Sequence, residues 1–185
     1  DSEVQLAVAD YKGGAVLTES RVPNSTSDLE PLETQNAFWQ SLEVELNRRE
    51  GFLRAQGFAS WEQAESQGSA PARMLVMVDE VVAAIRTTPK AMESLTRIAT
   101  KGRSLGMHLL VTSQSLVGIP REVLINLRSR LALAGTDEVE LLQLGCKEKL
   151  GNSPAQTKAA MLMHDGQTFR VSVPLGARRV PQSVA

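Results

Sequence analysis

The segment that most constrains the fold is a short apolar run, residues 74–78, that stops at two adjacent carboxylates, Asp79 and Glu80. Its sequence, M-L-V-M-V, has no polar position, which is typical of a central parallel strand covered on both faces. A second apolar run, residues 107–112, is followed by Ser and then Gln114. If the two strands are parallel, Glu80 and Gln114 emerge at the same edge of the sheet, where α/β proteins bind ligands.

These two strand ends have the chemistry of a nucleotide triphosphatase. One carboxylate would hold Mg²⁺ or its water ligands, the other would activate the attacking water, and the amide would contact the γ-phosphate. Apolar strands that end in Asp-Glu are also common in other proteins, so this pair alone is a weak signal. The second strand with its terminal Gln114, and the K-G-R-S turn at 101–104 before it, favour the triphosphatase.

Five segments together resemble one known family. They are A-D-Y-K-G-G-A at 9–15, S-L-E-V-E-L-N-R-R-E at 41–50, L-V-M-V-D-E at 75–80, R-I-A-T-K-G-R-S-L-G-M-H-L-L-V-T-S-Q at 97–114 and N-L-R-S-R-L-A-L at 126–133. In this order they are similar to the FtsK/SpoIIIE superfamily of RecA-like motor ATPases, over most of residues 4–174. The D-Y-K-G-G-A version is most similar to the ATPase modules of type VII secretion systems, the EccC/EssC group.

The resemblance implies ATP and Mg²⁺ as cofactors and gives roles to four residues. Asp79 would bind Mg²⁺ through water, Glu80 would activate the attacking water, and Gln114 would contact the γ-phosphate. Arg103, in K-G-R-S-L-G, would lie at a subunit interface and reach the γ-phosphate of the neighbouring subunit, where it neutralises charge in the transition state. The plain alternative for Arg103 is a solvated surface arginine.

The resemblance also places the turn Lys12-Gly13-Gly14 beside the nucleotide, with Lys12 in contact with a phosphate or a neighbouring subunit. The glycines permit a tight turn and close backbone approach. A glycine pair after a strand is more often only a turn, and that alternative stays open.

One expected part of the site is missing from the sequence. No G-x-x-x-x-G-K-[ST] segment occurs, although the backbone amides of this loop bind the phosphates in such enzymes. In the family the loop lies upstream of the D-x-K-G-G strand. Either the chain is part of a longer protein, or the module has lost nucleotide binding. The intact Asp79–Glu80 pair favours the longer protein.

The length of 185 residues predicts one domain. We expect an α/β fold, a RecA-like P-loop NTPase core without its phosphate-loop part, with a mostly parallel sheet flanked by helices. A C-terminal antiparallel hairpin would turn at Asp165-Gly166. The domain would cover residues 1–175, and 176–185 would be a linker or tail. The hydrophobic fraction of 42% and the charged fraction of 22% are those of a soluble globular protein.

Periodicity and end signals predict the other elements. We expect strands at 4–9, 131–134, 159–163 and 168–173, and helices at 36–56, 88–101, 121–127 and 136–144. The apolar face of the helix at 88–101 would contain Met92, Leu95, Ile98 and Ala99. Thr136 would cap the helix that follows it, and His108 would be a core histidine.

The resemblance implies a motor module that hydrolyses ATP to power protein export by a type VII secretion system. It would work in a homo-oligomeric ring, such as a hexamer, or beside tandem ATPase modules, and secreted proteins would be its substrates. It would be a cytoplasmic domain of a bacterial protein that reaches the membrane only through segments outside this chain.

Two alternatives stay open. One is a translocase of double-stranded DNA in chromosome segregation or conjugation. The other is a non-hydrolysing module that binds a substrate signal or regulates its neighbours. The balance of 20 Lys and Arg against 21 Asp and Glu gives no electrostatic footprint for nucleic acid, and together with the D-Y-K-G-G-A turn it favours secretion.

Overall fold

The structure, a computed structural model, describes residues 4–14, 23–146 and 159–172 of the chain. Contacts divide the chain into two compact units, Asp1–Leu127 and Arg128–Ala185. The predicted linker at 176–185 lies outside the described residues.

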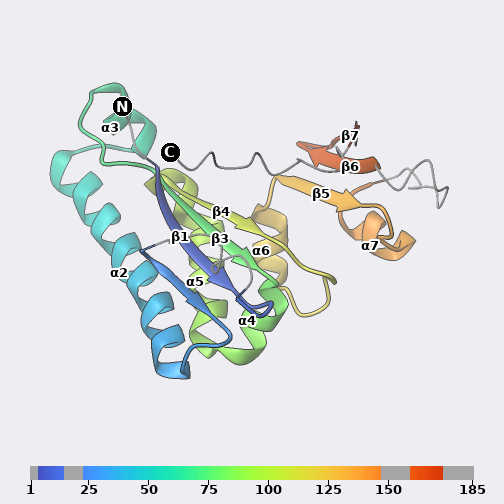
Figure 1. Ribbon diagram of the computed structural model, residues 1–185. Coiled ribbons are helices and arrows are strands. Elements are labelled where there is room, and N and C mark those ends of the chain that lie inside the picture. The colour runs from blue at the N-terminus through green and yellow to red at the C-terminus, as the bar shows by residue number, and fades with distance from the viewer. Residues whose placement is uncertain (1–3, 15–22, 147–158, 173–185) are drawn as a thin grey trace, which may run out of the picture. The chain divides into compact units, whose positions relative to one another are not determined.

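The first unit is built on a four-stranded parallel sheet of order β2-β1-β3-β4 (Figure 1). Its strands are β1 (Gln5–Asp10), β2 (Ser25–Ser27), β3 (Met74–Asp79) and β4 (Met107–Val111). The predicted parallel pairing of β3 with β4 is confirmed. Strand β2 was not predicted, because its three residues are polar and too short to show an alternating pattern.

Helices connect these strands. They are α2 (Leu32–Gln56), α3 (Trp61–Ser66), α4 (Val81–Thr87), α5 (Pro89–Lys101), the 3₁₀ helix η1 (Gly102–Leu105) and α6 (Arg121–Asn126). Helix α2 begins earlier than predicted, directly after Pro31. Helix α5 has Pro89 in its first turn, as predicted, because proline fixes a helical φ where no N–H is needed.

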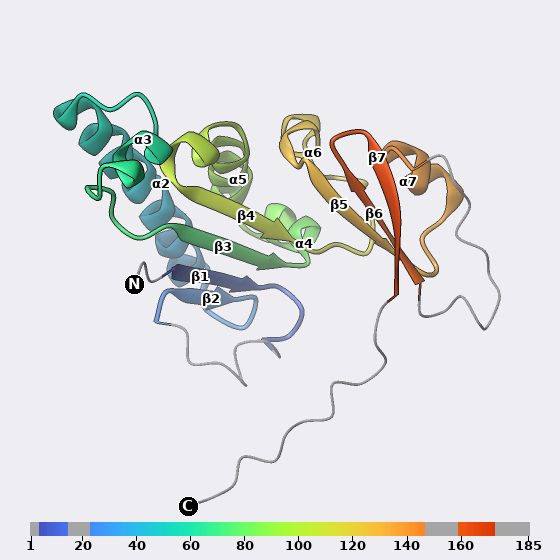
Figure 2. The same cartoon turned by 90° about the horizontal axis from the view of Figure 1, so that it is seen from above.

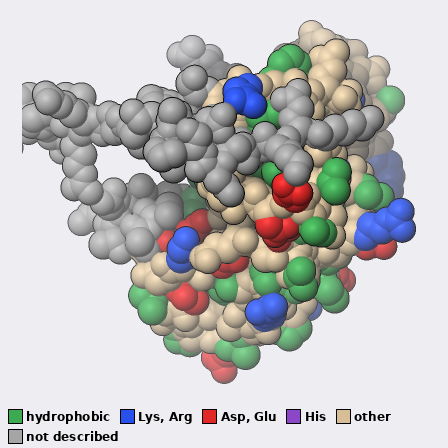
Figure 3. Space-filling view, turned by 90° about the vertical axis from the view of Figure 1, so that its right-hand side faces the viewer, with side chains coloured by type: hydrophobic (Ala, Val, Ile, Leu, Met, Phe, Trp, Pro, Cys, Tyr) green, Lys and Arg blue, Asp and Glu red, His purple; other side chains and the backbone are tan. Residues whose placement is uncertain are grey.

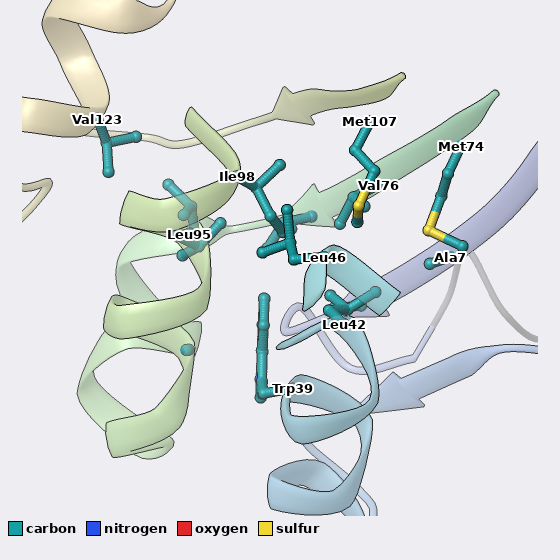
Figure 4. Packing of buried hydrophobic residues seen from close by; sticks show 14 of the residues in the cluster. Ala7, Trp39, Leu42, Leu46, Met74, Val76, Leu95, Ile98, Met107 and Val123 are labelled. Carbon is teal, nitrogen blue, oxygen red and sulfur yellow. The ribbon is translucent and has the colours of Figure 1, made fainter. Parts of the chain in front are cut away.

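Helices α2 and α5 pack against the same face of the sheet (Figures 1 and 2). Figure 4 shows their buried side chains directed toward strand residues such as Val76 and Met107. The helical contribution includes Trp39, Leu42, Leu46, Leu95 and Ile98. Burial of these apolar groups is the main force that holds the layers together.

The predicted apolar face of α5 is partly wrong. Met92 is 50% exposed, while Ala91, Leu95 and Ile98 are buried. Because residues 91, 95 and 98 follow the i, i+4, i+7 spacing of one helix face, the buried stripe excludes residue 92.

The face of the sheet opposite α2 and α5 differs from the prediction that strand β3 is covered on both faces. Strand β3 alternates between buried and half-buried residues, and Leu6 and Leu110 on the neighbouring strands are 42% and 49% exposed. The connections β2–α2–β3 and β3–α5–β4 run in the same direction across the sheet. Right-handed crossovers in one direction place their helices on one face, so the described helices leave the other face open.

The second unit holds a three-stranded antiparallel sheet of order β5-β6-β7. Its strands are β5 (Ser129–Leu133), β6 (Ala159–His164) and β7 (Gln167–Ser172), and its helix is α7 (Glu138–Gln143). The predicted hairpin at Asp165-Gly166 is confirmed. Both residues have positive φ, 48° and 79°, as the tight hairpin turn requires.

The predicted cap of α7 is wrong by one residue. The carboxylate of Asp137 accepts hydrogen bonds from the N–H groups of Val139 and Glu140. The hydroxyl of Thr136 instead donates to the carbonyl of Leu133. An aspartate at this position also suits the positive end of the helix dipole.

Candidate active site

The junction between β3 and α4 carries the two predicted carboxylates. Asp79 ends β3, and Glu80 has the left-handed backbone angles φ 57° and ψ 63°. This conformation costs about 1–2 kcal/mol for a residue with a side chain. It persists only where neighbouring groups enforce it, which is common at functional sites. The Glu80 carbonyl accepts hydrogen bonds from the N–H groups of Ala83 and Ala84, which start α4.

Thr112, the residue after β4, binds both sides of this junction. Its hydroxyl donates to the Asp79 carboxylate and accepts the backbone N–H of Glu80 over 3.1 Å. Its own N–H donates to the carbonyl of Val78, and its carbonyl accepts from Val81, each over 2.9 Å. The end of β4 is therefore joined firmly to the carboxylate-bearing turn.

Ser113 and Gln114 follow at the same edge. The Ser113 hydroxyl donates to the carbonyl of Ser115 over 2.6 Å and lies 3.4 Å from Oε1 of Glu80. Gln114 is exposed. Because β3 and β4 are parallel, Glu80 and Gln114 emerge at one edge of the sheet, as the sequence analysis expects.

The turn Lys12-Gly13-Gly14 lies at this edge too. The N–H of Tyr11 donates to the carbonyl of Asp79 over 3.1 Å. Gly13 and Gly14 have φ of 82° and 68°, so the tight turn that glycines permit does form here.

The backbone amides of this turn are already engaged. The N–H of Lys12 donates to the Asp10 carboxylate over 2.9 Å, and the N–H of Gly13 donates to the Asp28 carboxylate over 3.2 Å. Two carboxylates beside the turn oppose a phosphate held by these amides. A nucleotide role of this segment therefore depends on the exposed side chain of Lys12, and it stays a prediction.

Sequence reasoning missed Asp10, Asp28, Thr112 and Ser113. Asp10 is fully buried and is the register partner of Asp79, so the strand-end rule that found Asp79 applies to it as well. Thr112 was included in the predicted strand and was not assigned a role. No pattern in the sequence separates Asp28 from the other polar residues around it.

Arg103 is separate from these residues. It lies in η1, which precedes β4, whereas Thr112 and Gln114 follow β4. It is exposed at the opposite edge of the sheet, so it is not part of the site formed by Glu80. This position fits the predicted use of Arg103 by a neighbouring subunit, which remains a prediction.

The side chains fit a bound Mg²⁺ only together with a nucleotide. Among the described residues, no group of three or more His, Cys, Asp or Glu is arranged to hold a metal. Magnesium in nucleotide enzymes uses one or two carboxylates and completes its shell with phosphate oxygens and water. Asp79, with one oxygen held by Thr112, matches this sparse ligand set.

His108 is not a core histidine, which corrects the prediction. It is exposed on β4, and its Nε2 lies 3.0 Å from a guanidinium nitrogen of Arg73. Arg73 also forms a bidentate ion pair with Glu65. Partial burial and then the positive charge of Arg73 lower the pKa of His108.

Stability should therefore depend on pH through His108. Below its ordinary pKa of 6.5, the unfolded chain binds a proton that the folded chain rejects, so the free energy of unfolding falls as the pH drops through this range. The replacement His108→Gln should flatten this slope. Urea unfolding of the wild type and the variant at several pH values between 5 and 8 measures the slope. Equal slopes in the two proteins would contradict the expectation.

Solved structures of known proteins share the fold of this chain. The chain superimposes on a structure of EssC (ATPases 2 and 3) from Geobacillus thermodenitrificans with a TM-score of 0.78 and 15% identity, covering 93% of this chain and 33% of that one. EccC (ATPases 2 and 3) of Thermomonospora curvata, in complex with a signal sequence peptide, gives 0.69 and 19%, over 93% and 32%. The conjugation coupling protein TcpA of pCW3 gives 0.72 and 16%, over 91% and 51%. The fold is that of a RecA-like ATPase core.

Relatives in sequence indicate which group of ATPases the chain is related to. The chain is 31% identical to the ESX-5 secretion system protein EccC5 of Mycobacterium marinum over 146 residues, 71% of this chain. It is 30% identical to EccCa1 of the ESX-1 system of Mycobacterium tuberculosis over 160 residues, 75% of this chain. The chain is thus related to the type VII secretion ATPases, in sequence to EccC proteins and in fold to EccC and EssC, as the sequence analysis predicts.

The chain spans only 10% of EccC5 and 21% of EccCa1. No protein-family model matches it. Within the described residues, none of the helices has the length and apolar character needed to cross a membrane.

Proposed function

We propose that this chain is part of a motor module that binds and hydrolyses ATP to power protein export by a type VII secretion system. The observation that carries the proposal is the Asp79–Glu80 turn, with Glu80 held in a left-handed conformation at the edge where β1, β3 and β4 end. A strained acidic turn at the ligand-binding edge of a parallel sheet suits catalysis better than a structural role.

Each side chain at this edge has a role in the proposal. Asp79 would orient water on Mg²⁺ beside the phosphates, Glu80 would take the proton of the attacking water, and Gln114 would contact the γ-phosphate. Arg103 would act on the site of an adjacent subunit in a ring, or of an adjacent module in tandem. Its exposure at the far end of β4 supports a role in trans.

The proposal requires a phosphate-binding loop from outside this sequence, and the first unit offers a place for it. Among the described residues, β4 pairs with β3 alone, and Leu110 on β4 is half exposed. A further parallel strand could pair with the outer side of β4. The chain could then continue through a helix back toward β1. That crossover would run opposite to the described ones, so its helix would cover the open face of the sheet. Its strand-to-helix loop would lie beside Gln114.

Protein export is favoured over DNA transport as the work of the motor. The similarity to EccC proteins is supported by both sequence and fold, whereas the similarities to EssC and to the conjugation protein TcpA are similarities of fold. On the face that Figure 3 shows, acidic, basic and apolar side chains of the described residues are interspersed, and no basic stripe is seen there. Proteins that move along DNA bind its phosphates through basic side chains of this kind. We also propose that the module lies in the cytoplasm, where ATP is available.

Stimulation of the ATPase separates the two kinds of motor. A polypeptide that carries this chain together with its phosphate-binding loop should ignore linear duplex DNA and respond to a substrate signal peptide. The measurement is the ATPase rate with DNA at low and moderate salt, and with the peptide. Strong stimulation of the ATPase by DNA that falls steeply with salt would contradict the export proposal and indicate a DNA translocase.

A non-hydrolysing, peptide-binding module is the second candidate, and a groove between α5 and α6 favours it. The groove has a volume of about 400 Å³, enough for a few peptide side chains. Its lining combines apolar, hydroxyl, acidic and basic groups, namely Met92, Glu93, Thr96, Arg97, Pro120 and Glu122. In this case ATP turnover would be dispensable and peptide binding would be the activity.

A further inference from the structure

The hydroxyl group of Thr112 lies between the two acidic residues of the candidate site. It donates a hydrogen bond to the Asp79 carboxylate and accepts one from the backbone N–H of Glu80. A hydroxyl has one proton and two lone pairs, so it makes both bonds at once. We propose that Thr112 is a positioning residue that fixes the Asp79 side chain relative to the Glu80 backbone. The inference rests on the proposed ATPase function.

The peptide group between Asp79 and Glu80 is held from two sides. Its carbonyl accepts the N–H of Tyr11, which follows β1, over 3.1 Å. Its N–H donates to Thr112, which follows β4, over 3.1 Å. The next N–H, of Val81, donates to the carbonyl of Thr112 over 2.9 Å. These bonds enforce the positive φ of Glu80, which the residue would otherwise avoid.

The direction of the Glu80 side chain depends on this backbone. Its contact with the Ser113 hydroxyl is long, at 3.4 Å, and that hydroxyl donates more closely to the carbonyl of Ser115, at 2.6 Å. The single proton of Ser113 serves the shorter bond. Side-chain bonding to Ser113 therefore contributes little to the position of the carboxylate, and the turn fixed by Thr112 contributes most.

Two replacements separate the hydroxyl from the rest of the side chain. Thr112→Val keeps the shape and removes the hydroxyl, whereas Thr112→Ser keeps the hydroxyl. Thr100→Val is the matched control, because the Thr100 hydroxyl bonds only to carbonyls of its own helix. We would measure amide hydrogen exchange at Glu80 by NMR in this chain. In the polypeptide that includes the phosphate-binding loop, we would measure kcat and KM for ATP.

The expected result is faster exchange at Glu80 in Thr112→Val and a kcat lower by about ten- to a hundred-fold, with KM for ATP unchanged. Thr112→Ser and Thr100→Val should behave as the wild type. A wild-type kcat for Thr112→Val, or a Ser variant as slow as the Val variant, would overturn the inference. If the wild type hydrolyses no ATP, the proposed function fails, and the exchange rate alone decides: unchanged exchange at Glu80 overturns the inference, and faster exchange supports it.

Discussion

The replacement Glu80→Gln should lower ATP turnover at least about a hundred-fold and leave ATP binding intact. The amide has nearly the same shape as the carboxylate and keeps the turn held by Thr112. It cannot take the proton of the attacking water, so only the chemical step is affected. The test uses the polypeptide that includes the phosphate-binding loop, with ATP binding measured by calorimetry and turnover by phosphate release.

The control is Glu33→Gln, at an exposed position in the first turn of α2, which should leave both quantities unchanged. If Glu80→Gln turns over ATP at the wild-type rate, Glu80 is not the base. If Glu80→Gln loses turnover but still supports export, the peptide-binding candidate gains over the motor.

The replacement Arg49→Met should destabilise the protein by about 3–5 kcal/mol. The Arg49 side chain is fully buried, and burial lowers its pKa. Its guanidinium group donates to the carbonyls of Ala72, Leu105 and Gly106 and lies 4.5 Å from the ring centre of Trp61. Methionine fills the space but leaves these carbonyls without a donor.

A neighbouring residue provides a matched control. Arg48 and Arg49 both bind the carboxylate of Glu45. The side chain of Arg48, however, is 50% exposed. Arg48→Met should therefore cost less than about 1 kcal/mol. Urea unfolding of both variants measures the difference, and equal costs would contradict the assigned role of Arg49. Because Arg49 binds the carbonyl of Leu105, Arg49→Met should also loosen η1, which carries Arg103.

The sequence predicted the parts of the fold that follow from local patterns. The apolar runs of β3 and β4 and the proline start of α5 are such signals, and the Asp165-Gly166 hairpin is another. Strand β2 and the open face of the sheet depend on how distant segments meet, which periodicity does not encode. No local rule indicates that the guanidinium group of Arg49 would bind three backbone carbonyls.

The sequence predicted which residues follow the strand ends at the candidate site, but it did not predict the hydrogen bonds between them. Glu80 and Gln114 could be placed because parallel strands end at a common edge. The hydroxyl of Thr112 could not, because its bonds to Asp79 and Glu80 depend on the register of β4 against β3. Small polar residues beside an acidic pair carry too little signal for sequence analysis to assign them a role.

The most direct test of the motor is a titration with ATP and Mg²⁺ by calorimetry, on this chain and on the polypeptide that adds the phosphate-binding loop. Carboxylates alone make a poor nucleotide site, because the phosphates need amide donors. The account predicts very weak binding by residues 1–185 alone, and micromolar binding with turnover once the loop is present. Micromolar binding by residues 1–185 alone, or no ATP hydrolysis by the longer polypeptide, would contradict it.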